Sequence, residues 1–134
     1  MSSKAVRDAF RASWSTAVPD IDFYETVNDD PDHSTIPALW ATAEFQSYND
    51  EPITLGNPAC YRETGIITVV LATTAGIGDD DLLVAAEKVR DAYRHWRSGD
   101  IRVVQVDPPL NEGFSDGNYY IMDVDISYVY DTNL

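Results

Sequence analysis

Residues 61–99 read YRETGIITVVLATTAGIGDDDLLVAAEKVRDAYRHWRSG, and this stretch decides the fold because a strand pattern is followed directly by a helix pattern. A strand is predicted over 61–73, where the apolar run at 66–71 shows little alternation. Such a run is typical of a strand covered on both faces, within the chain or by another subunit. Gly76 and Gly78 then break the chain, and the aspartates at 79–81 begin a helix that ends before Gly99. The apolar stripe of this helix is Leu82, Ala86, Val89, Tyr93 and Trp96.

The rest of the chain adds one helix and three strands. The first helix begins after Ser2 or Ser3, keeps Val6, Phe10 and Trp14 on one face, and ends at Pro19. Strands are predicted over 38–48, 101–106 and 119–130, with loops at 20–37, 49–60 and 108–118, and a short edge strand could form near Phe23. This order predicts one α+β domain over residues 1–134, with two helices packed on one face of a largely antiparallel or mixed sheet of four to five strands.

Charge is abundant and unevenly distributed. The chain has 9 Lys and Arg against 23 Asp and Glu, which gives a net charge of −14, so nucleic acid and anionic membranes are repelled at long range. No Lys or Arg lies between Arg11 and Arg62 or after Arg102, and the remaining basic residues concentrate in the two predicted helices. We therefore expect acidic and basic side chains on separate surfaces, so that copies of the chain could dock head to tail.

Sequence motifs for catalysis or for cofactor and metal binding are not found. The chain has one cysteine, Cys60, and neither an HExxH nor a GxSxG motif, so we predict no enzyme activity, no cofactor and no metal site. The acidic run that contains His33 is interpreted as a solvated loop rather than a cation site. Without a signal peptide or a long apolar stretch, the expected compartment is the cytoplasm and no membrane association is expected.

The order of segments resembles the tail terminator, or tail completion, proteins of long-tailed bacteriophages. The likeness runs from Val18 to Trp96. It rests on the Val18-Pro19 pair before Phe23, on the 39–65 segment that ends in Tyr61-Arg62-Glu63-Thr64-Gly65, and on Thr74-Ala75-Gly76-Ile77-Gly78 before the acid-capped helix. The loop at 28–37 has no matching counterpart in the family.

The resemblance implies a structural virion protein rather than an enzyme. Subunits of this family form a closed ring, by similarity a homohexamer, that caps the tail tube and presents a surface to the head-side connector or neck protein. DNA would pass through the ring without specific binding. The protein would be made in the cytoplasm of the bacterial host and located at the head-proximal end of the tail.

Two sets of residues are candidates for the surfaces of such a ring. The expected ring or docking contact consists of Arg90, Arg94, Arg97, Ile66, Val69 and Leu71. The expected acidic lumen or docking face consists of Asp123, Asp125, Asp29, Asp30, Asp32, Asp50 and Glu51. Acidic side chains lining a passage would repel phosphates and let a duplex slide.

Two other functions stay open at this point. A head-tail neck adaptor shares the phage setting but would lie at a different position in the virion. A small acidic ligand-binding or enzyme domain would instead place Asp123 and Asp125 in an apolar cleft, where carboxylates of displaced pKa could act as an acid-base pair. The simpler interpretation of these two aspartates is a solvated sheet face.

Overall fold

The computed structural model describes residues 3–23, 39–53, 60–74, 80–115 and 119–133. Its two helices and seven strands are, in chain order, α1 (Lys4–Ala17), β1 (Asp22–Phe23), β2 (Leu39–Pro52), β3 (Cys60–Thr74), α2 (Asp80–Tyr93), β4 (Arg97–Ser98), β5 (Ile101–Val106), β6 (Leu110–Ser115) and β7 (Tyr119–Asn133). Six strands form the path β1-β2-β3-β7-β5-β4, and β6 also pairs with β7. The β1–β2 pair is parallel and the other pairs are antiparallel.

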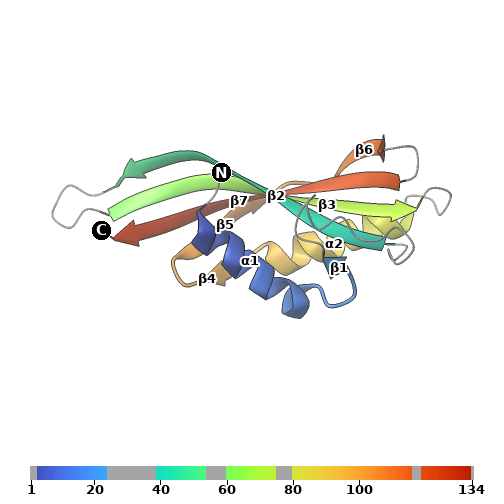
Figure 1. Cartoon of the computed structure of the whole chain (residues 1–134), viewed down its shortest axis with the longest axis horizontal. Coiled ribbons are helices and arrows are strands. Elements are labelled where there is room, and N and C mark those ends of the chain that lie inside the picture. The colour runs from blue at the N-terminus through green and yellow to red at the C-terminus, as the bar shows by residue number, and fades with distance from the viewer. Residues whose placement is uncertain (1–2, 24–38, 54–59, 75–79, 116–118, 134) are drawn as a thin grey trace.

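The α+β class and the mixed sheet are confirmed, and both helices lie on the same side of the sheet (Figure 1). The predicted count of four to five strands is too low. The short strand β1 matches the edge strand expected near Phe23. Of the two strands that were not predicted, β4 has only two residues, which is too short to produce a periodic pattern. The other, β6, lies in the predicted loop at 108–118 and carries Asn, Glu and Gly between its apolar residues.

Strands β2, β3 and β7 are longer than predicted and form the centre of the sheet. The β2–β3 register continues as far as Pro52↔Tyr61, beyond an irregularity between Ser47 and Asn49. Asp50 and Glu51 are therefore strand residues, and their prediction as loop residues is wrong. At the end of the sheet where the C-terminus lies, these three strands extend beyond α1 and α2 (Figure 1).

The core lies between the helices and one face of the sheet. The predicted apolar positions of α1, Val6, Phe10 and Trp14, are buried there. The ring of Phe10 packs 4.9 Å from that of Tyr93 on α2 and 5.7 Å from that of Phe45 on β2. Rings that meet in tilted or edge-to-face arrangements add to the stability that their buried area provides.

Helix α2 is shorter than the sequence pattern predicts. It ends at Tyr93, and the backbone N–H of Trp96 donates to the carbonyl of Tyr93 at 3.2 Å. Trp96 still packs against the core from outside the helix. Arg97 belongs to β4, so it does not continue the α2 row of arginines as expected.

The start of α1 is attached to the sheet through β3 and β7. Glu63 Oε2 accepts two hydrogen bonds, one from Tyr128 Oη at 2.7 Å and one from the backbone N–H of Ser3 at 3.4 Å. Tyr128 lies directly opposite Gly65, where a Cβ would be only 2.6 Å from the tyrosine oxygen. Gly65 is therefore required for close packing, because any side chain here would displace the tyrosine that holds Glu63.

Candidate interaction surface

The sheet face opposite the helices is the most distinctive surface of the described residues. Side chains alternate along strands, so residues on this face are identified by the register and by the burial of their neighbours. We call it the open sheet face, and it consists of Trp40, Thr42, Glu44 and Glu51 of β2, Arg62, Thr64, Ile66, Thr68 and Val70 of β3, Ile121, Asp123, Asp125, Ser127, Val129 and Asp131 of β7, Arg97, Arg102 and Leu110. None of the described helices lies over it (Figure 1).

One part of this face is acidic. Glu44, Thr68 and Asp125 lie side by side across three strands, and Asp123 is in the next row. Thr68 Oγ1 donates to Asp125 Oδ1 at 2.8 Å, which fixes the direction of that carboxylate. We call Glu44, Asp123 and Asp125 the acid band. Leu110, opposite Asp123 on β6, is 59% exposed, so the band has an apolar border.

Another part, nearer the end of β7, carries arginines. Arg97 and Arg102 are direct cross-strand partners, and we call these two the arginine band. Like charges placed opposite each other repel, so this pair favours an anionic partner. Arg62, close by, donates to both carboxylate oxygens of Asp131 at 2.7 and 3.0 Å. These hydrogen bonds hold the pKa of Asp131 below its usual value, and the charge of Arg102 acts in the same direction.

The helix side of the molecule is mixed in charge, which corrects the expectation of separate acidic and basic surfaces. Lys88 lies 3.6 Å from Asp20, and Arg94 lies 3.9 Å from Asp91. Both pairs are largely exposed and contribute little to stability. Arg90 differs, because its Nε is buried and no acceptor among the described residues reaches it.

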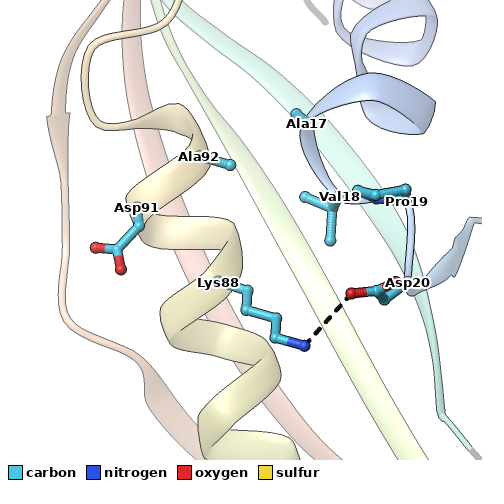
Figure 2. Close-up of a pocket in the computed structure, with 7 residues that line it drawn as sticks. All are labelled: Ala17, Val18, Pro19, Asp20, Lys88, Asp91 and Ala92. Atoms are coloured by element: carbon cyan, nitrogen blue, oxygen red, sulfur yellow. Dashed lines mark ion pairs between the residues drawn. The ribbon is translucent and has the colours of Figure 1, made fainter.

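A groove runs between the end of α1 and α2 (Figure 2). Its volume is about 390 Å³, and its lining residues are Ala17, Val18, Pro19, Asp20, Lys88, Asp91 and Ala92. Figure 2 shows Lys88 reaching from α2 toward Asp20, with the Val18 side chain beside the pair. The polar groups of this lining are exposed, so the groove lacks the enclosed carboxylates that acid-base catalysis would need.

The structure separates the predicted contact residues into different environments. Val69 and Leu71 are fully buried beneath the helices, so they have no surface to offer a neighbour and are corrected to core residues. Ile66 lies on the open sheet face and is half-buried. Arg90 and Arg94 are on the helix side, whereas Arg97 shares the open sheet face with Asp123 and Asp125.

The predicted acidic residues are also divided. Asp123 and Asp125 lie on the open sheet face, as their alternation along the strand indicated. Glu51 is opposite Arg62 on this face, and Asp50 is opposite Glu63 on the other face. Asp29, Asp30 and Asp32 lie outside the described residues. Sequence patterns missed Glu44 and Arg102 as members of the surface, because only the register places them beside their neighbours.

Two structural features are absent from the described ranges, a cluster of metal-ligating side chains and a membrane-spanning helix. Within them, no three His, Cys, Asp or Glu side chains lie close enough together to hold a metal ion. The same ranges contain no helix of the length and hydropathy needed to span a membrane.

The comparisons with known proteins identify a fold but no family. No family model and no curated protein matches the chain. Eleven chains of solved structures match it in three dimensions. One of them is 13% identical, with a TM-score of 0.54, and the match covers 92% of this chain and 94% of that chain. At this identity the likeness shows that the fold recurs over nearly the whole length, and it shows nothing about function.

Proposed function

We propose that this protein is a structural tail terminator of a long-tailed bacteriophage, which closes the tail tube as a homo-oligomeric ring and forms the surface that joins tail to head. The order of segments between Val18 and Trp96 supports the choice of family. The proposed partners are copies of the chain, the tail tube protein and the head-side connector.

The observation that carries the proposal is that the acid band and two arginines of α2 lie on opposite sides of the sheet, although each side as a whole carries both signs of charge. The acid band lies on the open sheet face, whereas Arg90 and Arg94 lie on α2, on the other side. A ring requires a heterologous contact, in which one surface of a subunit meets a different surface of the next. The acid band of one copy against the α2 arginines of the next is a contact of this kind.

The two arginines differ in what they can offer this contact. Arg90 Nε is buried, so a neighbouring carboxylate could reach Arg90 only through the exposed part of its side chain. Arg94, whose Asp91 partner is 3.9 Å away and exposed, can exchange that weak pair for a better one.

The charge of the chain suits a passage for DNA. With −14 per copy, a ring of identical subunits repels phosphate, so a duplex would pass through it without adhering.

The test is capping of purified tail tubes, with the added protein observed by electron microscopy and its stoichiometry measured by mass. We expect a ring at one end of each tube and no further tube growth. Arg94→Glu should weaken ring formation at least tenfold while thermal unfolding of the monomer changes little. The matched control is Lys4→Glu, which reverses an exposed charge on α1 instead.

Failure to bind tube ends, with the monomer folded, would contradict the tail terminator. Binding to isolated head connectors and not to tubes would favour the neck adaptor instead.

A further inference from the structure

We propose that the open sheet face is also a self-complementary surface, on which two copies pair face to face with the arginine band of each against the acid band of the other. The occupant of this face is therefore a second copy of the chain. The inference uses Arg97 and Arg102, which the ring contact does not employ, and it does not depend on the existence of the ring.

The charge of the face is the first argument. It carries three arginines, Arg62, Arg97 and Arg102, against five carboxylates, Glu44, Glu51, Asp123, Asp125 and Asp131, and its net charge is −2. The whole chain carries −14. Because this face carries both signs of charge and a net charge of only −2, two copies can meet on it with much less repulsion than their whole-chain charge would give.

The arrangement of charge along β7 is the second argument. Arg102 is opposite Val129, and the acid band is at Asp125 and Asp123, four to six residues away along the strand. A twofold axis in the plane of the contact, crossing the strands near Ile66 and Ser127, reverses the strand direction of the second copy. Arg102 of each copy then faces Asp125 of the other, so each charge contact occurs twice, as an isologous dimer requires.

The side chains between the two bands suit such a contact. Ile66 lies at the centre and Val70 toward the acidic end, both half-buried, and Leu110 is exposed at the acidic border, whereas Val129 toward the other end is only 8% exposed. Sheets pack face to face through apolar side chains of this kind. The fixed Asp125 carboxylate, bonded to Thr68, loses little conformational entropy when an arginine reaches it.

The size of the face sets the expected strength. Four strands spaced about 4.8 Å apart and eight residues of about 3.3 Å along β7 give a footprint of roughly 500 Å² per copy. This is below the roughly 800 Å² per partner of a standard stable interface. We therefore expect a weak, reversible dimer. Because the dimer covers the acid band, it competes with the ring contact and keeps free subunits from assembling away from the tube.

Sedimentation velocity of the full chain over a range of concentrations, at physiological ionic strength, tests the proposal. We expect a monomer–dimer equilibrium for the wild type. Arg102→Glu and Asp125→Lys should each raise the dissociation constant of the dimer at least tenfold. Each variant turns the contact between residues 102 and 125 into a pair of like charges, and this contact occurs twice in the dimer. Lys4→Glu, the exposed control on α1, should leave it unchanged.

Mixing the two variants provides the decisive measurement. In a face-to-face pair, the carboxylate introduced by Arg102→Glu on one chain meets the ammonium introduced by Asp125→Lys on the other. The native Asp125 of the first chain then meets the native Arg102 of the second, so the mixture should dimerise although neither variant does alone. If circular dichroism shows that the Arg102→Glu variant is unfolded, Arg97→Glu replaces it, since the side chain of Arg97 is exposed.

Three results would overturn the inference: a wild type that stays monomeric at millimolar concentration, a dimer indifferent to charge reversal at Arg97 and Arg102, or folded variants that do not dimerise when mixed. Rings on tube ends in any of these cases would leave the proposed function standing, so the two failures are distinguishable.

Discussion

The two faces of β3 differ more than its sequence suggests. Ile67, Val69 and Leu71 have no exposed surface and pack beneath the helices, whereas Ile66 and Val70, in the same apolar run, are half-buried on the open sheet face. The uniform run of β-branched and aliphatic residues therefore combines a folding surface and a surface suited to association. The difference teaches that burial in the monomer, and not hydrophobicity alone, separates the residues that hold the fold from those available to a partner.

The largest expected effect comes from truncating one residue on each face of the same strand. Leu71→Ala should lower the free energy of unfolding by about 3 kcal/mol, because it removes buried methyl groups and leaves a cavity. Ile66→Ala should cost less than about 1.5 kcal/mol, because that side chain is half in solvent already. Urea denaturation of the two variants measures both values. Equal losses would show that the two faces do not differ in their contribution to the monomer.

The second prediction concerns the close contact that joins β3 to β7 on the helix-covered face. Gly65→Ala should cost about 2 kcal/mol, because the new Cβ would overlap the carbonyl oxygen of Gln46 and approach Tyr128 Oη to 2.6 Å. The matched control is Gly99→Ala, where φ is +58° but nothing lies within 4 Å of the new Cβ. Backbone strain alone should cost about 1 kcal/mol there. Thermal and urea unfolding compare the two, and a smaller loss at Gly65 would contradict the packing argument.

Much of the fold could be predicted from the sequence, because hydrophobic periodicity indicates which residues are buried. The apolar spacing of Val6, Phe10 and Trp14 predicts α1, and the alternation after Tyr119 correctly assigns Asp123 and Asp125 to the face opposite the core. The extension of β2 through Asp50 and Glu51 could not be predicted, since these residues favour turns. Pairing with β3 places Glu51 beside Arg62, and this tertiary contact overrides local preference.

The candidate surface was less predictable than the fold. It depends on which strands are neighbours and on the register in which they pair. Local sequence patterns indicate neither, because the paired residues are far apart in the sequence. Arg97 and Arg102 are near each other in sequence, but Arg97 follows the helix pattern of α2, and only the end of α2 at Tyr93 allows the two to pair across β4 and β5. The acidic and basic segments noted in the sequence are consequently interleaved on one face.

The third prediction examines the helix-covered face at alkaline pH. Burial raises the pKa of Tyr93 to about 12, from 10.0, although its hydrogen bond with Ser13 acts in the opposite direction. The unfolded chain ionises first, so the stability that Tyr93 contributes is complete below pH 10 and is lost as the pH rises from 10 to about 12. Tyr93→Phe should lower the free energy of unfolding by about 1 kcal/mol at pH 7, because the hydrogen bond with Ser13 is lost. Above pH 10 the free energy of unfolding of this variant should fall less steeply with pH than that of the wild type.

Ser13→Ala is the control for that prediction, because it removes the same hydrogen bond and keeps the titrating phenol, although it also removes the bond from Ser13 Oγ to the carbonyl of Phe10. The difference between the urea midpoints of the two variants should therefore stay constant near pH 7 and change only in the alkaline range, up to about pH 12. If their alkaline slopes coincide, Tyr93 is not the source of the pH dependence.

The smallest expected effect is on the open sheet face, at the other end of the pH scale. Arg62 holds the pKa of Asp131 below the usual 3.8, so the stability that this pair contributes is present above that pH and is lost as the pH falls through the lower folded-state pKa. Asp131→Asn should therefore lower the urea midpoint slightly at pH 7, and the difference from wild type should shrink in acid.

Asp8→Asn is the control, since Lys4 lowers the pKa of Asp8 within a more exposed pair on α1. The Asp131 difference should be the larger of the two, because two hydrogen bonds and less exposure to solvent favour its charged form. An equal or smaller difference at Asp131 would mean that solvent screens the Arg62–Asp131 pair on the open sheet face as completely as it screens the Lys4–Asp8 pair on α1.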